Sequence, residues 1–377
     1  MMNKERLLNT FLELTKIDGI HGKESAIAEF LHAKLKELNC SVVIDEAGQS
    51  FGGNSGNIIG YKEGDPNLSP IFLCAHMDTI KSTKNIKHSI TNGIIETDGN
   101  TILGGDDRAG IAVILEVLEI LNEEKIKHCP LEIVFTVCEE AGMFGAKFIK
   151  KENLKSKFGY VFDCQASPGN YIVEAPGASS FIATFMGKSS HAAVSPELGI
   201  NAISMAGKGI ANLKLGRWGE TGMMNIGKIE GGVAINVVPD SVVVEGETRN
   251  SDNIKLNEQL EYISKNFSDA ADELNGKVIF KVTSKYKGYK FEGEEEFVTA
   301  AREAIKTAGL LPKGISYPGG SDANIFNSNG IDALNMGVGF KNAHSLNEKI
   351  AENDLYKIAE IALNLVEYFS KSVSISE

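Results

Sequence analysis

Two apolar segments with an apolar helix pattern between them restrict most strongly how this chain can fold. Residues 71–75 and 131–137 are almost unbroken runs of apolar side chains, and residues 107–121 carry such side chains at helical spacing. A strand that is apolar on both faces has to be covered on both faces, which is typical of parallel sheets. A shorter apolar run follows at 160–162. Because strands and helices alternate, we expect an α/β fold with a largely parallel mixed sheet.

The pattern of apolar residues changes after residue 176 and changes back near residue 290. Between these points apolar and polar side chains alternate along several segments, which indicates strands with one face in water. The chain has 377 residues, more than one ordinary domain contains. We therefore expect a discontinuous α/β domain at 1–176 and 290–377, with an α+β domain inserted at 177–289. The expected strands of the insertion are 179–185, 223–229, 242–247 and 277–286, and its helices are 199–213 and 252–274.

Composition excludes some classes of partner. The formal net charge of −12 argues against a nucleic-acid partner, which needs a basic surface. The longest uncharged stretch, 175–187, is too short to cross a bilayer, and the N-terminal residues lack the apolar core of a signal peptide. The five cysteines form no CxxC pair and are expected to be buried, reduced thiols of a cytoplasmic protein.

His76 differs from most of the seven histidines because it ends the apolar segment 71–75. Residues i and i+2 of a strand point the same way, so Asp78 can lie beside the imidazole ring. A carboxylate on one ring nitrogen leaves the other nitrogen free for a metal, although an ordinary structural histidine is the alternative. Four other histidines lie among polar residues and are expected to be exposed, namely His21, His32, His88 and His128.

Two pairs of acidic residues occur where further elements begin or end. Asp106 and Asp107 follow two glycines at the start of the apolar helix, where either could simply cap that helix. Glu139 and Glu140 follow the second apolar segment. Adjacent buried like charges repel unless a cation lies nearby, and a solvated loop is the alternative.

Asp163 and His344 complete the set of candidate ligands. Asp163 ends the short apolar run, and His344 lies in a glycine-rich loop with Glu348 four residues later. Each signal is weak alone. Together, successive segments that end in His, Asp, Glu-Glu and Asp, joined by a late His, predict a metal site. Nitrogen and oxygen ligands without thiolates suit zinc, cobalt or manganese.

Nine short motifs make the chain similar to a known family. In order they are HMDT, GGDDRAG, VCEEAG, FDCQ, SSHAAVSPELGINAI, GGVAINVVPD, GETRNSD, PGGSDANIF and HSLNE. In this order they resemble the two-zinc exopeptidases, the family that includes carboxypeptidase G and succinyl-diaminopimelate desuccinylase. Within it, the likeness is greatest to the peptidase T branch, the tripeptide aminopeptidases. The resemblance covers nearly the whole chain.

The resemblance implies a centre with two zinc ions, with cobalt or manganese as alternatives. Asp106 would bridge both ions. His76 and Asp163 would complete the coordination of one ion, and Glu140 and His344 that of the other.

The resemblance also implies a mechanism of metal-assisted hydrolysis. Zinc-bound water would attack the peptide carbonyl with Glu139 as general base, while Asp78 would orient the metal-ligating histidine. The family usually has lysine where this chain has Arg108, which keeps the positive charge. Cys164 stands where glycine is frequent, so a thiol is expected close to the metal ligands.

The inserted domain would be the lid and dimerisation domain of the catalytic domain. His191 matches a lid histidine that helps to stabilise the tetrahedral intermediate, often in the partner subunit's site. Asn236 and Arg249 match residues that bind a substrate carboxylate or carbonyl. Gly319 and Gly320, with the following serine, match a loop that lines the substrate pocket.

The expected activity is removal of the N-terminal residue from short peptides, in a possible homodimer. A carboxypeptidase, a dipeptidase or an N-acyl amino-acid deacylase would use the same site and stays open. A catalytically inactive binding protein would lack a ligand or the base, whereas this chain has them all.

Overall fold

The computed structural model describes residues 2–219 and 221–371, which form two compact units. Unit 1 comprises residues up to 173, together with 291–315 and those from 321 onward; unit 2 comprises 174–290 and 316–320. Segment 316–320 packs with unit 2 although the sequence pattern places it in the α/β domain. Each unit has its own buried apolar core.

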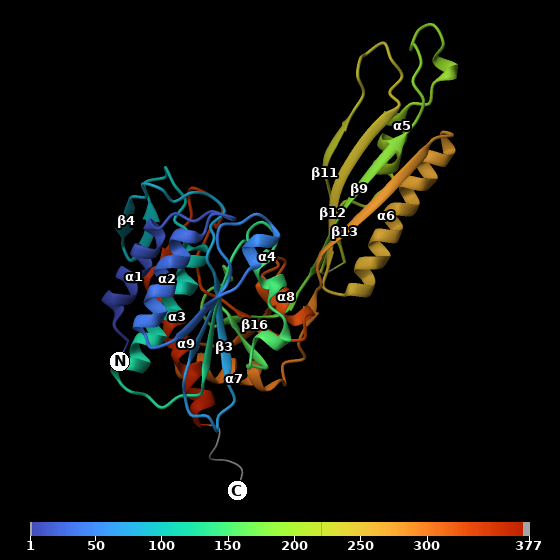
Figure 1. The fold of residues 1–377 in the computed structure, drawn as a ribbon. Helices are drawn as coiled ribbons and strands as arrows, with labels where there is room; N and C mark the ends of the chain where they lie inside the picture. Colours follow the sequence, from blue (N-terminus) through green and yellow to red (C-terminus); the bar gives the residue numbers. More distant parts are fainter. Residues whose placement is uncertain (1, 220, 372–377) are drawn as a thin grey trace. The chain divides into compact units, whose positions relative to one another are not determined.

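A nine-stranded mixed sheet, most of whose strands lie in unit 1, is the main sheet of the described residues (Figure 1). Its four middle strands, in the order β6-β3-β7-β16, are parallel, and the strands on either side pair antiparallel. This confirms the expected largely parallel mixed sheet. The strands are β1 (Ser41–Ile44), β2 (Ile58–Lys62), β6 (Leu131–Thr136), β3 (Ile71–His76), β7 (Phe158–Val161), β16 (Asp332–Met336), β8 (Asn170–Ala175), β14 (Tyr289–Lys290) and β15 (Lys313–Ser316).

Helices cover both faces of this sheet (Figure 1). α3 is buried along almost its whole length, packs on β3, and is covered in turn by α1 and α9. A helix that is apolar on nearly every side needs such cover. The helices of unit 1 are α1 (Lys4–Lys16), α2 (Ser25–Glu37), α3 (Gly105–Glu123), α4 (Phe144–Phe148), α7 (Glu296–Thr307), α8 (Asp322–Ser328) and α9 (Glu352–Lys371). A small sheet is formed by β17 (Ile350–Ala351), β5 (Ile94–Thr97) and β4 (His88–Thr91).

Unit 2 is an antiparallel sheet with helices on one face. The strand order is β10-β11-β12-β9-β13, and α5 and α6 pack over a core that includes Phe181, Phe185 and Phe267. The opposite face exposes residues such as Ile182 and Ile279, as the alternating pattern predicts. The elements are β9 (Gly177–Met186), α5 (Ala202–Ala211), β10 (Gly216–Trp218), β11 (Gly222–Gly231), β12 (Ser241–Asn250), α6 (Asn253–Glu273) and β13 (Lys277–Tyr286).

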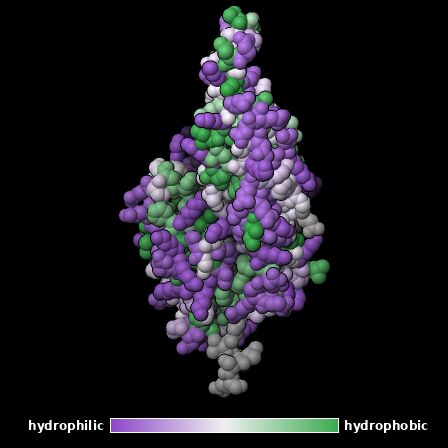
Figure 2. All heavy atoms as spheres, turned by 90° about the vertical axis from the view of Figure 1, so that its right-hand side faces the viewer, coloured by the Kyte–Doolittle hydropathy of each residue, from purple (hydrophilic) through white to green (hydrophobic). Residues whose placement is uncertain are grey.

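The face of the molecule shown in Figure 2 is mostly hydrophilic, with apolar side chains among polar ones at the end of unit 2, at the top of the view. No helix in the described ranges is long and apolar enough to cross a membrane. All five cysteines are buried, and none forms a disulfide. The expected exposure of His128 is wrong: its ring is buried, and Nδ1 lies 2.7 Å from the carbonyl oxygen of Cys129. The loop before β6 packs into unit 1, which its polar composition does not reveal.

Candidate metal centre

The carboxyl end of β3 places His76 at the centre of the candidate site. Its ring Nδ1 lies 3.0 Å from the carbonyl oxygen of Asp78, so Nδ1 donates there and Nε2 is the nitrogen that faces the neighbouring acidic side chains. The Asp78 carboxylate is farther from Nδ1, at 3.5 Å. Nε2 points at two further carboxylates, 3.0 Å from Asp106 Oδ1 and 3.8 Å from Asp163 Oδ1.

Asp106 lies between two histidines. One carboxylate oxygen faces His76, and the other lies 3.4 Å from Nε2 of His344. Burial alone would raise the pKa of the Asp106 carboxyl, but hydrogen bonds to His344 and His76 outweigh burial and lower that pKa. Although the first turn of α3 contains Asp106, its backbone there is extended rather than helical. The carboxylate therefore projects from the helix start between the two rings.

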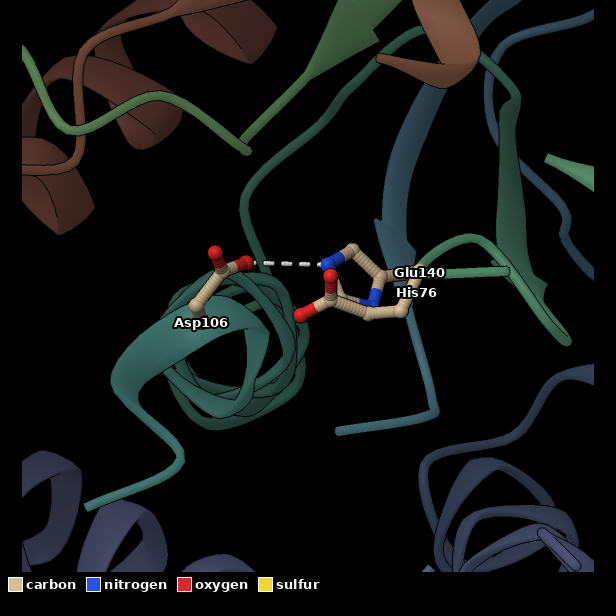
Figure 3. Close-up of side chains that lie close together, drawn as sticks. All are labelled: His76, Asp106 and Glu140. Carbon is tan, nitrogen blue, oxygen red and sulfur yellow. Dashed lines mark hydrogen bonds and ion pairs between the residues drawn. The ribbon is translucent and has the colours of Figure 1, made fainter. Parts of the chain in front are cut away.

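Glu140 comes from the loop after β6 and lies beside the late histidine. Its Oε2 is 2.9 Å from His344 Nε2, whereas its buried Oε1 has no hydrogen-bond partner among the described residues. Figure 3 shows His76, Asp106 and Glu140 grouped from the end of β3, the start of α3 and this loop. Their ligand atoms all lie within 4.8 Å of one another.

A second group of possible ligands contains His76, Asp107 and Asp163, also within 4.8 Å of one another. The family resemblance implies Asp106 rather than Asp107 as the ligand that accompanies His76 and Asp163. Asp107, however, already accepts the backbone N–H groups of His76 and Gly110, each at 3.1 Å. Its carboxylate thus holds the end of β3 against α3, a contact that the sequence did not reveal.

Two buried carboxylates hold the turn that carries Glu139 and Glu140. Asp78 accepts the N–H groups of Glu139 and Glu140 at 2.9 and 3.1 Å, and Glu24 accepts the N–H of Cys138 at 3.0 Å. Burial raises the pKa of the Glu139 carboxyl well above its usual range, and the charge of His76 opposes that rise. Asp78 therefore orients the acidic turn as well as facing the histidine ring.

Glu348 fixes the start of α3 from the opposite end of the chain. Its two carboxylate oxygens accept the N–H groups of Gly104 and Asp106 at 2.8 and 2.9 Å. The side chain is 1 % exposed, and burial raises its pKa to about 7. In the sequence Glu348 stands out only as an acidic residue four positions after His344, and no pattern indicates its hydrogen bonds with Gly104 and Asp106.

The donor set fits a divalent metal. Burial raises the pKa of the Asp163 and Glu140 carboxyls, because buried negative charges repel one another and lack water. Hydrogen bonds to Asp106 and Glu140 raise the pKa of His344 to about 10. A cation would relieve this excess of negative charge, and Glu140 Oε1 is a buried acceptor whose hydrogen-bonding capacity is unused.

The predicted substrate residues of unit 2 form two groups. His191 and Asn236 are both exposed and lie in neighbouring segments. His191 forms an antiparallel β-bridge with Val237, and the N–H of Ala192 donates to the carbonyl of Asn236 at 3.0 Å. His191 Nδ1 accepts two backbone N–H groups of its own turn at 3.2 Å, so the ring orientation is fixed locally.

Arg249 lies near the C-terminal end of β12, whereas the turn with Asn236 precedes the first residue of that strand. Its guanidinium is 3.2 Å from the carboxylate of Glu247 and donates weakly to the carbonyl of Pro318 at 3.4 Å. Beyond Pro318, a Cβ on Gly320 would lie 2.5 Å from the Tyr286 ring. The absence of a side chain at Gly320 therefore lets the loop 318–320 lie directly on this ring.

Comparison with known proteins decides the family. The model of "Peptidase family M20/M25/M40" matches residues 72–368, which is most of the chain. The chain belongs to this peptidase family. It is therefore a peptidase, as the order of its motifs predicts.

Similarity to known peptidases extends over nearly the whole chain. The structure of the aminopeptidase PepT from Bacillus cereus is 36% identical, covers 98% of this chain and 100% of its own, and superposes with a TM-score of 0.94. A tripeptidase from Staphylococcus aureus is 37% identical, with coverage of 99% and 100% and a TM-score of 0.95. Peptidase T of Clostridium novyi is 28% identical over 305 residues, 78% of this chain and 72% of that protein.

Proposed function

We propose that this M20 peptidase is a two-metal aminopeptidase that removes the N-terminal residue from tripeptides. The observation that carries the proposal is the position of Asp106, with one carboxylate oxygen facing His76 and the other facing His344. A single carboxylate with a histidine on each side is suited to bridge two cations. Full-length similarity to an aminopeptidase and to a tripeptidase supports the substrate class.

The residues divide between two ions in a way that agrees with the contacts. His76 and Asp163 would complete one ion, because His76 Nε2 faces Asp163. Glu140 and His344 would complete the other, because they contact each other directly. Nitrogen and carboxylate donors without thiolates suit zinc, with cobalt or manganese as alternatives. When bound, such ions polarise the scissile carbonyl and lower the pKa of water.

Glu139 would move the proton. Its carboxyl is buried and its pKa is raised, which suits a group that accepts a proton from water and then delivers it to the leaving amine. The hydrogen bond from the Glu139 N–H to Asp78 limits movement of the turn. Because Glu140 on the same turn is the neighbouring ligand, the base lies next to the metal centre without occupying a ligand position.

Unit 2 would supply the substrate contacts. His191, whose Nδ1 is engaged by its own turn, has Nε2 left to meet the developing oxyanion, with Asn236 beside it. Arg249 would bind the C-terminal carboxylate of the peptide, since a guanidinium can contact a carboxylate through two nitrogens. That role requires Arg249 to exchange its contact with Glu247 for the substrate. The proposal includes a homodimer formed through unit 2.

A panel of peptides on metal-loaded enzyme tests the substrate class. We expect a free tripeptide to be cleaved at its first bond, and N-acetylation to abolish cleavage because the free amine would be recognised. Amidation of the C-terminus should raise KM, because the proposed partner of Arg249 is lost. Cleavage of the N-acetylated peptide at an unchanged rate would instead identify a deacylase or a carboxypeptidase. Preference for dipeptides over tripeptides would identify a dipeptidase.

A further inference from the structure

Asn335, on β16, makes three hydrogen bonds that use its whole amide group. Its Nδ2 donates to the carbonyl oxygen of Asp163 at 2.8 Å and to Ser321 Oγ at 2.9 Å, while its Oδ1 accepts the Asp163 N–H at 3.2 Å. The residue is only 3 % exposed. Because an N–H must meet the amide oxygen and a carbonyl must meet the amide nitrogen, these contacts fix the amide orientation.

These contacts continue the sheet beyond the end of a strand. β16 and β7 pair in parallel up to Asn335 and Val161, and β7 ends at Val161. Asp163 therefore lies outside the backbone ladder. The Asn335 side chain bonds both backbone groups of Asp163, as a neighbouring strand would. A residue held at both its N–H and its carbonyl has a fixed backbone, which fixes the direction in which its side chain leaves the chain.

Ser321 connects the same amide to a second segment. Residues 316–320 belong to unit 2, and the chain enters unit 1 at Ser321. Ser321 caps α8 through a reciprocal contact with Asn324. Its hydroxyl is therefore fixed on the helix side and offers a fixed acceptor to Asn335.

We propose that Asn335 is a positioning residue that aims the Asp163 carboxylate at the metal and ties it to Ser321 at the start of α8. This inference rests on the proposed metal centre and adds a residue to it that the sequence motifs do not contain. Partners that orient a metal ligand typically contribute about 10–100-fold to metal affinity.

The chain offers a matched control in Asn327 on α8, whose backbone partner Ala333 lies on the same strand as Asn335. Asn327 Nδ2 donates to the carbonyl of Ala333, and its Oδ1 accepts the Ala333 N–H, both at 2.9 Å. Asn327 thus makes the same two-point contact with the backbone, but with a residue that is not a candidate ligand. Its removal should reduce stability without affecting the metal.

The test compares N335L with N327L in the full-length chain. Zinc affinity is measured by calorimetric titration of the metal-free protein, and hydrogen–deuterium exchange is measured for the peptide containing Asp163. We expect N335L to weaken one zinc site about 10–100-fold and to speed exchange at Asp163. N327L should leave both readouts at the wild-type level. N335A leaves space for water and should show a smaller loss of zinc affinity than N335L. It replaces N335L in the comparison if N335L does not fold.

Three results overturn the inference. Wild-type zinc affinity and exchange in both Asn335 variants would show that the contact does not position Asp163. An equal loss of zinc affinity in N327L would show a general effect of stability. Failure of the wild-type chain itself to bind zinc, cobalt or manganese would overturn the metal centre and the inference with it, and is recognised before any variant is examined.

Discussion

Glu139 and Glu140 are adjacent in the chain but have different surroundings. The Glu140 carboxylate contacts His344 at 2.9 Å, whereas Glu139 forms backbone hydrogen bonds, from its N–H to Asp78 and from the N–H groups of Gly142 and Met143 to its carbonyl. The contact with a candidate metal ligand supports Glu140 as the ligand. Glu139 keeps a buried carboxyl that no candidate ligand contacts directly. The separate roles of base and ligand therefore agree with the geometry of the turn.

The first prediction concerns these two carboxylates. E139Q should keep two metal ions per chain and lower kcat by about 10²–10⁴-fold, because the amide cannot take up a proton. E140Q, the matched control one residue away, should lose metal, because it removes a charged ligand. Metal analysis and tripeptide hydrolysis measure both effects. Near wild-type turnover by E139Q would assign the base elsewhere.

The second prediction concerns Glu24, which supports the same turn. Its Oε1 accepts the N–H groups of Gly22 and Cys138, and burial raises its pKa from 4.5 to about 7. Between pH 4.5 and about pH 7 the Glu24 carboxyl is therefore protonated in the folded state but ionised in the unfolded state. The contribution of Glu24 to the free energy of unfolding is fully present below the unfolded pKa and is lost as pH rises through the folded pKa.

E24Q keeps an acceptor oxygen but cannot ionise. Relative to wild type it should be more stable at pH 8 by about 2 kcal/mol, with the difference disappearing near pH 4.5. Urea unfolding of both proteins from pH 4.5 to pH 8 measures this difference. A difference that stays constant with pH would mean that Glu24 does not titrate in this range.

At the scale of elements, α3 approaches the end of β7 so closely that only glycine fits between them. A Cβ on Gly110 would lie 2.4 Å from the carbonyl oxygen of Phe162 and 2.6 Å from Asp107 Oδ1. Gly207 on α5 is also helical, but a Cβ there would meet nothing within 4 Å. Replacement by alanine can therefore be compared at a crowded helical glycine, Gly110, and at an open one, Gly207.

The third prediction uses this pair. G110A should destabilise unit 1 by about 1–3 kcal/mol, because the added methyl group displaces Phe162 or Asp107 next to the candidate ligands. G207A should stabilise unit 2 by about 0.5–1 kcal/mol, because alanine favours the helix. Chemical denaturation of each variant measures both values. A neutral G110A would show that α3 can move away from β7.

The strand ends that carry the candidate ligands could be predicted because each is a local pattern. An apolar run followed by His76 or Asp163 is visible in a few residues, and the parallel sheet follows from the same runs. The contacts of Glu348 with Asp106 and of Asn335 with Asp163 join residues 242 and 172 positions apart. Spacing and periodicity carry no information about such contacts, which depend on tertiary packing.

At the scale of the whole molecule, the chain forms two units with separate cores and two natural probes. The single tryptophan, Trp218, lies in unit 2 and packs on Tyr262 with ring centroids 5.1 Å apart. All five cysteines lie in unit 1 and are buried. The change in periodicity near residues 176 and 290 predicts an inserted domain at 177–289, and the structure places 174–290 in unit 2. The membership of 316–320 in unit 2 could not be predicted, because it depends on contacts such as that of Pro318 with Arg249.

The fourth prediction follows from the position of every candidate metal ligand in unit 1. A metal that binds only the folded site, at about 100 times its Kd, should stabilise unit 1 by about 2.7 kcal/mol. Thiol labelling of the buried cysteines during urea unfolding should report this shift, while Trp218 fluorescence should keep its midpoint, because the core of unit 2 contains none of the ligands. E140Q with the same metal serves as the control and should show a smaller shift in labelling. If fluorescence and labelling move together on metal addition, the two units unfold as one cooperative system despite their separate cores.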